Sequence, residues 1–144
     1  MGREVLLRKT RTDMNKIEFN TQIATTIEQS KRLLELGLKP ETSDMHHYKW
    51  SEGYWEIQSC PPRGSNSRFI PAWSLHRLIT ILPLKIEDDY STESFLKIEG
   101  SNIVYKVKDI FIYNSFEKNN IYDNIIDCIE WLIKDYYFNK DYLK

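Results

Sequence analysis

The order of helical and strand patterns constrains this fold more than any other feature of the sequence. Helices are predicted at residues 27–36, 73–82 and 121–136, because apolar residues recur there at helical spacing between capping residues and breakers. Between them lie short segments of alternating polarity, predicted as strands: residues 45–50, 54–58, 84–87, 95–99, 103–107 and 110–114. We therefore predict an α+β fold, in which an antiparallel sheet (a hairpin plus a three-stranded meander) packs with about three helices.

Length and composition favour one domain. The chain has 144 residues, of which 41% are apolar and 28% charged, so it is long enough to bury a core and too apolar to be disordered as a whole. Residues 16–144 are predicted to form this domain, with a short strand at 16–21. Residues 1–15 are predicted to form a flexible basic arm. Aromatic residues reach 13%; two interpretations stay open, a tyrosine-rich sheet or a surface that contacts another molecule.

The net charge of −1 gives no general attraction to nucleic acid or to a membrane surface. Arginine is nevertheless confined to the first part of the chain, at Arg3, Arg8, Arg11, Arg32, Arg63, Arg68 and Arg77. Because arginine suits bidentate recognition of phosphate and carboxylate, any anion site is expected there. DNA or RNA binding through the basic arm is kept as a minor alternative.

Cysteine usage and apolar runs bear on the compartment. Two cysteines, Cys60 and Cys128, are too few for a disulfide framework, and both are interpreted as thiols. No apolar run approaches the roughly 20 residues of a membrane span, and the first residues do not resemble a signal peptide. We therefore expect a cytoplasmic protein without a membrane partner.

The strongest functional signal is a loop that leads into a helix. The loop at residues 60–67 contains two prolines, a glycine and Arg63, and Arg68 follows it. We predict that Arg63, Arg68 and Arg77 neutralise an anionic ligand. Stacking on its planar part is predicted for Trp73 together with Tyr54 or Trp55. The competing interpretation is that Trp73 plugs the core between helix and sheet.

Catalytic and metal-binding patterns are weak. His46 and His47 are adjacent and would point to opposite faces of a strand, so a metal shared with Cys60 or His76 is not expected. Cys60 with a histidine could form a nucleophile and base, but no oxyanion hole or orienting group is identifiable. No glycine-rich phosphate motif occurs. We expect neither an enzyme nor a cofactor.

Two stretches support a resemblance. The sequence from Ile27 to Met45, followed by Ile70-Pro71-Ala72-Trp73-Ser74-Leu75, resembles small uncharacterised proteins encoded by phages, prophages and mobile elements of Bacteroides-type gut bacteria, and residues 127–134 are also similar. The resemblance covers most of residues 16–136 and supplies no catalytic residues. It implies an accessory gene of a mobile element, whose product acts in the cytoplasm of the bacterial host cell.

Two functional hypotheses follow. The first is a non-enzymatic binding protein that sequesters a small anionic, nucleotide-derived host defence signal, an anti-defence function, as a homodimer or larger homo-oligomer with sites near subunit contacts. The alternative is a protein–protein adaptor or inhibitor that presents the aromatic residues of the 45–58 hairpin to a host protein.

Overall fold

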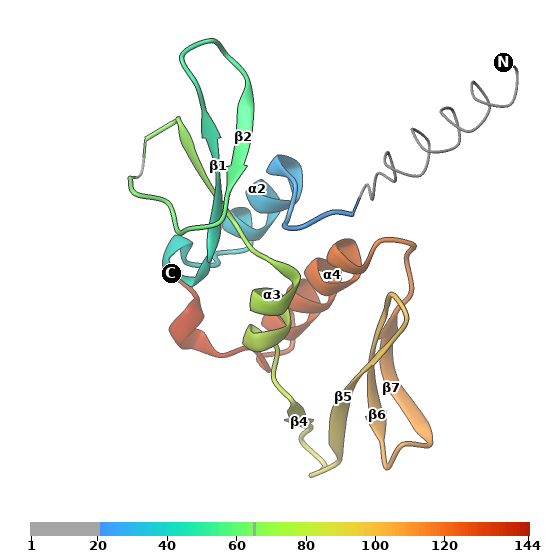
Figure 1. Cartoon of the computed structure of the whole chain (residues 1–144). Helices are drawn as coiled ribbons and strands as arrows, with labels where there is room; N and C mark the ends of the chain where they lie inside the picture. Colours follow the sequence, from blue (N-terminus) through green and yellow to red (C-terminus); the bar gives the residue numbers. More distant parts are fainter. Residues whose placement is uncertain (1–20, 65) are drawn as a thin grey trace, which may run out of the picture.

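The structure, a computed structural model, describes residues 21–64 and 66–144 (Figure 1). The predicted arm at 1–15 and the start of the predicted strand at 16–21 lie outside these residues. The helices are α2 (Ile27–Glu35), α3 (Leu75–Ile81) and α4 (Ile121–Lys134), with 3₁₀ turns at Pro40–Thr42 and Lys140–Tyr142. The strands are β1 (Met45–Lys49), β2 (Trp55–Gln58), β3 (Phe69–Ala72), β4 (Lys85–Glu87), β5 (Glu93–Glu99), β6 (Asn102–Val107) and β7 (Phe111–Phe116).

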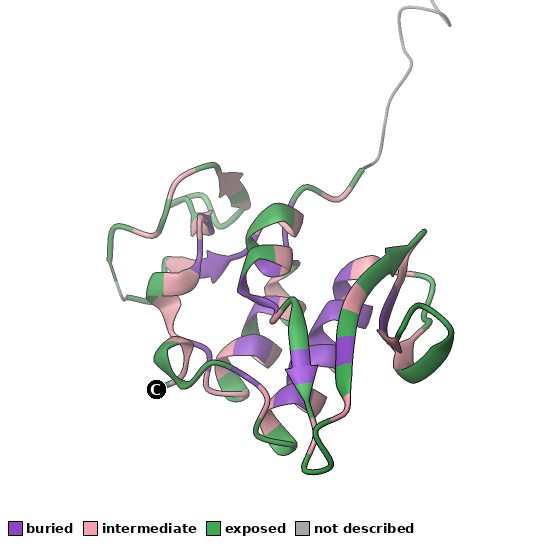
Figure 2. Ribbon diagram, turned by 90° about the horizontal axis from the view of Figure 1, so that it is seen from below, coloured by how far each residue is buried: buried purple, intermediate pink, exposed green. Residues whose placement is uncertain are grey.

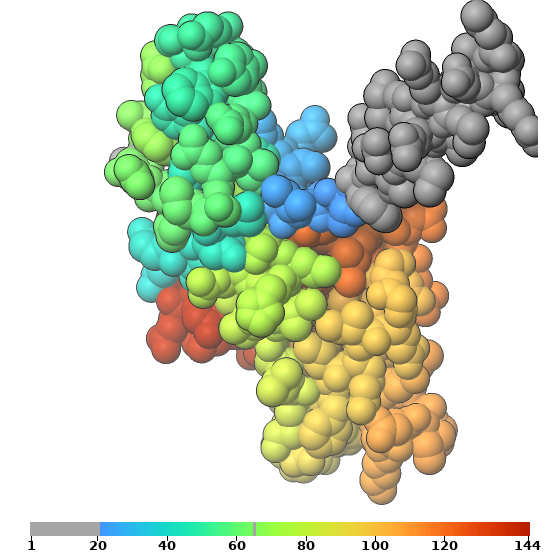
Figure 3. Space-filling model, viewed as in Figure 1, coloured from blue at the N-terminus to red at the C-terminus, as the bar shows by residue number. Residues whose placement is uncertain are grey.

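The predicted α+β class is confirmed, and the strands divide between two antiparallel sheets. The smaller sheet has the order β2-β1-β3 and the larger the order β4-β5-β6-β7. The two sheets lie toward opposite ends of the molecule, with α3 and α4 between them (Figure 1). In the space-filling view the β1–β2 hairpin, in teal and green, projects from the body at the end opposite to β4–β7 (Figure 3).

The ends of α2 follow from local sequence. Thr26 and Gln29 form a capping box in which each side chain accepts a hydrogen bond from the backbone N–H of the other residue. At the other end Gly37 adopts a φ of 99°, and the N–H groups of Gly37 and Leu38 donate to the carbonyls of Leu34 and Leu33. This closing pattern requires a left-handed residue, which explains why a glycine stands there.

The start of α3 differs from the prediction, which places Trp73 inside the helix. The helix begins at Leu75, after Ser74, whose hydroxyl accepts a hydrogen bond from the Arg77 N–H. Residues 69–72 are extended and pair with β1 as strand β3, which the sequence analysis missed. Pro71 is tolerated in that strand because β3 lies at an edge of its sheet.

Helix α4 forms the centre of the core. Its fully buried apolar side chains are Ile125, Ile126, Cys128, Ile129 and Leu132. They pack against residues of α2, α3 and the central strand β6, so the buried surface runs along α4 and onto the inner strand face (Figure 2). None of the described helices reaches the length and apolar character that a membrane crossing requires.

Candidate functional site

A cavity lies beneath the loop that joins β2 to β3. Its volume is about 780 Å³, within the range of small-molecule sites. It is lined by Leu34, Pro40, Glu41, Pro61, Pro62, Arg63, Gly64, Phe69, Pro71 and Lys144. We call this space the loop cavity. The proline and glycine residues that predicted an irregular loop therefore build one wall of it, and β3 builds another.

The lining of the loop cavity is apolar with a few charges. Four prolines, Leu34 and Phe69 supply the apolar part, while Arg63 and Lys144 bring positive charge and Glu41 a negative one. Arg63 is exposed, and among the described residues no carboxylate forms an ion pair with it. A guanidinium without a protein partner beside an apolar wall is suited to an anionic group of a ligand.

Phe69 connects the loop cavity to a row of aromatic rings on the same sheet face. Successive ring centroids lie 5.6 Å apart for His46 and Phe69, 5.2 Å for Phe69 and Tyr48, and 5.0 Å for Tyr48 and Trp50. Tyr54 extends the row with a stacked contact to Trp50 at 6.3 Å. The row arises from strand register, because Tyr48 pairs with Phe69 across the sheet and alternate residues share a face. We call these five residues the aromatic row.

The outer end of the aromatic row is accessible. Trp50 is 37% exposed and Tyr54 57% exposed, at the tip of the β1–β2 hairpin. The Trp50 indole N–H donates to Glu56 Oε2 over 2.7 Å, which holds the ring across the strand pair. Gly53 closes the hairpin with a φ of 96°, as its turn position demands. The outer end of the row therefore offers ring faces that are held in place and open to contact, whereas His46 at the inner end is 1% exposed.

The structure brings only some of the predicted ligand-binding residues together. Arg63 lines the loop cavity, and Tyr54 belongs to the aromatic row. Trp55 points to the opposite face of the hairpin, where the Lys49 ammonium lies 5.7 Å from its ring centroid. Arg68 and Arg77 are exposed, and neither lines the loop cavity. The sequence predicts either Tyr54 or Trp55 as the second stacking residue. Because neighbouring residues of a strand point to opposite faces, only Tyr54 lies on the face of the aromatic row.

Trp73 requires a correction. The sequence analysis assigned its indole to ligand stacking, but the side chain is 0% exposed. Its ring N–H donates to Thr42 Oγ1 over 2.9 Å, and its backbone N–H donates to Thr25 Oγ1 over 3.0 Å. A sealed and fully hydrogen-bonded indole has no face for a ligand. The competing interpretation, a plug in the core, is confirmed.

The histidines are separated, as the alternation predicts. His47 Nε2 lies 2.8 Å from the Thr25 carbonyl, and His46 Nδ1 lies 2.6 Å from the Cys60 carbonyl on the other face. His76 is exposed on α3. No group of three or more metal-ligating side chains occurs within the part of the chain that the structure describes. His46 Nε2 is buried without a hydrogen-bond partner, behind the wall that Phe69 and Pro71 form.

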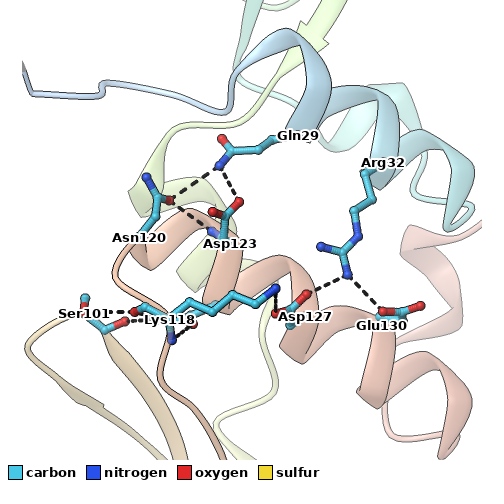
Figure 4. A network of polar contacts seen from close by, with 9 residues as sticks. Gln29, Arg32, Ser101, Lys118, Asn120, Asp123, Asp127 and Glu130 are labelled. Atoms are coloured by element: carbon cyan, nitrogen blue, oxygen red, sulfur yellow. Dashed lines mark hydrogen bonds and ion pairs between the residues drawn. The ribbon is translucent and has the colours of Figure 1, made fainter.

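A second polar cluster joins α2 to α4 and has a structural role (Figure 4). Arg32 donates to Asp127 over 2.7 Å and to Glu130 over 2.9 Å, and Lys118 pairs with Asp127 at 2.8 Å. Partial burial opposes ionisation of Asp127, but hydrogen bonds from Lys118 and Arg32 outweigh it and lower its pKa. Because every charge here has a protein partner, this cluster stabilises helix packing and offers no free charge to a ligand.

Sequence reasoning missed part of the candidate site. Phe69 and Tyr48 are joined by the pairing of β3 with β1, and Lys144 reaches the cavity from the far end of the chain. The alternation of aromatic residues at 48 and 50, within a predicted strand, was a usable signal for the row.

Comparison of the chain with protein-family models, curated proteins and solved structures finds no match.

Proposed function

We propose that this chain is a binding protein that holds an extended segment of a partner protein along the aromatic row, with one end of that segment in the loop cavity. The observation that supports this most is the continuity of the surface. Four rings, each within 6.3 Å of the next, lead from Tyr54 at the exposed hairpin tip to Phe69 in the wall of the loop cavity. In that cavity, Arg63 has no ion-pair partner among the described residues. Aromatic residues and arginine dominate the energetics of protein recognition.

The shape of the surface favours an extended ligand over a compact one. Residues 48 and 50 are separated by about 7 Å along the strand, and the row continues in both directions beyond them. The nucleotide site predicted from the sequence needs Arg68, Arg77 and Trp73 to converge with Arg63, and they do not. The proposal therefore takes up the adaptor hypothesis, with the aromatic face of the hairpin as its contact surface.

The partner proposed is a protein of the bacterial host cell. The resemblance to products of phages and mobile elements supports this setting, since such a protein acts on molecules that it meets in the host cytoplasm. The exposed rings suit apolar and proline-containing segments, which stack on Trp and Tyr with little loss of entropy. Arg63 and Lys144 favour an acidic residue, or a chain-terminal carboxylate, at the cavity end.

Affinity capture with the full chain as bait tests the proposal. The bait is exposed to cytoplasmic extract of a Bacteroides-type bacterium, and any stoichiometric protein is purified and titrated in isolation. The double variant Trp50→Ala/Tyr54→Ala is expected to weaken that binding at least about tenfold, because both stacking faces are lost. Tyr136→Ala removes a ring elsewhere that is 85% exposed, more than either of these two, and is expected to leave the affinity unchanged. Equal affinity for the double variant and the wild type would contradict the proposal.

A second candidate function rests on the loop cavity alone. Arg63 and Lys144 beside an apolar wall could bind a small phosphorylated or nucleotide-derived anion. The sequestration hypothesis is then kept, with the loop cavity as the binding site in place of the predicted cluster around Trp73. Calorimetry with cyclic nucleotides and ADP-ribose derivatives checks this, with Arg63→Ala expected to abolish binding and Arg68→Ala, outside the cavity, to preserve it. Absence of binding by the wild type at tens of micromolar would exclude this candidate.

A further inference from the structure

Strand β7 is an open edge of the larger sheet. It pairs with β6 on one side and with no strand of the described chain on the other. None of the seven residues from Ile110 to Phe116 carries a charge. At the start of this stretch, Ile110, Phe111, Ile112 and Tyr113 are 73%, 67%, 59% and 38% exposed. Lysines, prolines and bulges are the usual devices that keep an edge strand from pairing with another chain; β7 has no lysine or proline, and its pairing with β6 contains one register shift, between Tyr105 and Lys106.

Both faces of the sheet are apolar at this edge. Ile112 pairs with Lys106 and shares the outer face with Phe95. Phe111 pairs with Val107 on the inner face, where the Tyr113 ring also contacts Trp131. An apolar side chain on one face alone would suit a partner that covers that face. Apolar residues on both faces suit a partner that extends the sheet, because an added strand provides neighbours on each side.

The exposed apolar area at this edge is a large part of what a stable dimer buries. At roughly 200 Å² for each large apolar side chain, residues 110–113 expose roughly 450 Å². This is more than half of the roughly 800 Å² per partner in a standard interface.

We propose that a second copy of this chain pairs its β7 antiparallel to this β7, across a two-fold axis at Ile112. This register places Ile112 against itself on the outer face and Phe111 opposite Tyr113 on the inner face, so each pair shares a face. Cross-strand aromatic pairs of this kind stabilise sheets.

The opposite edge of the sheet explains why the assembly would stop at two copies. Strand β4 has only three residues, and Lys85 and Glu87 flank its single buried residue, Ile86. A short and charged edge resists pairing. Because β7 is the only long uncharged edge of this four-stranded sheet in the described chain, the two-fold contact closes and leaves an eight-stranded sheet.

Sedimentation of the full chain tests the proposal. The wild type is expected to have a sedimentation-derived mass of twice the 17.3 kDa of one chain at micromolar protein concentrations. Ile112→Lys is expected to be a monomer with an unchanged circular dichroism spectrum, because a buried charge would face its own copy. Tyr54→Lys changes a side chain of nearly the same exposure in the other sheet and is expected to stay dimeric. A monomeric wild type, or a dimeric Ile112→Lys variant, would overturn the proposal.

Crosslinking tests the register without relying on the lysine variant. In a Cys60→Ser background, Ile112→Cys is expected to form an intermolecular disulfide under mild oxidation, because the two Cβ atoms face each other at the axis. Ser115→Cys serves as the control, since residue 115 would oppose residue 109 and not its own copy. Crosslinking by Ser115→Cys in preference to Ile112→Cys would refute this register.

Discussion

The packed helices and the β1–β2–β3 sheet use the same residue types in opposite ways. In the helical region, the Trp73 indole is sealed and hydrogen-bonded, and Arg32 has two carboxylate partners. On the sheet, the Trp50 ring is open to solvent and Arg63 lines a cavity without an ion-pair partner among the described residues. A buried tryptophan and an ion-paired arginine therefore maintain the fold, whereas an exposed tryptophan and an arginine without an ion-pair partner indicate where another molecule binds.

The largest expected effect concerns Trp73. Trp73→Ala removes a fully buried indole and leaves Thr42 Oγ1 without its donor. We expect the free energy of unfolding to fall by about 3–5 kcal/mol. Urea denaturation followed by circular dichroism measures this loss. A decrease as small as that of an exposed tryptophan would mean that the ring is not a structural plug.

Thiol reactivity sharpens the contrast between the regions. Cys128 is buried in α4, where burial first and the nearby Asp127 charge second raise its pKa far above the ordinary thiol value. Cys60 is partly exposed beside the loop cavity. With a thiol reagent at neutral pH, we expect Cys60 to react at least about a hundredfold faster than Cys128. Denaturant is expected to abolish the difference. Equal rates in the native state would contradict the described packing of α4.

The Arg32 cluster gives a smaller, pH-dependent effect. Arg32→Met is expected to lower stability by about 1 kcal/mol at pH 7, since the ion pairs are partly exposed. The folded pKa of Asp127 is lower than its unfolded value, so the folded chain binds fewer protons. The stabilisation that Asp127 gains from its ion pairs is therefore present above a pH of about 4 and is lost as the pH falls below that value. Denaturation of both proteins between neutral pH and acid would show a difference that shrinks; a constant difference would argue against the ion pairs.

The smallest stability effects are expected at the candidate site. Arg63→Ala and Tyr54→Ala remove exposed side chains, so each is expected to change the unfolding free energy by less than about 0.5 kcal/mol. The same denaturation assay checks them. A loss comparable to that of Trp73→Ala would place these residues in the structural group and remove the reason for assigning them to binding.

Local sequence signals predicted the elements that depend on neighbouring residues. The sequence offers two capping registers before α2, Thr25 with Glu28 or Thr26 with Gln29, and the structure uses the second. The positive φ of Gly37 and the Gly53 turn likewise depend on residues nearby in the sequence. For the same reason, the apolar stripe of α4 predicted the burial of Ile125, Ile129 and Leu132 correctly. The prediction was wrong at Tyr136, which lies beyond the end of α4 at Lys134 and is 85% exposed.

The features that the sequence did not predict depend on contacts between residues far apart in the chain. Trp73 is buried because Thr42 and Thr25, 31 and 48 residues away, supply its hydrogen-bond partners. Arg32 and Arg63 look alike in the sequence, and only the packing of α2 on α4 gives one of them its carboxylates. Strand β3 contains Pro71, which argues against a strand unless the strand is known to lie at a sheet edge.

Hydrogen–deuterium exchange of the full chain, with and without its purified partner segment, tests the central claim most directly. We expect new protection in β1, β2 and residues 61–71, where the aromatic row and the loop cavity lie. Exchange in α4 is expected to stay unchanged, because its core is already closed. Protection elsewhere, with the β1–β2 hairpin exchanging as in the free protein, would contradict the assignment of the binding surface.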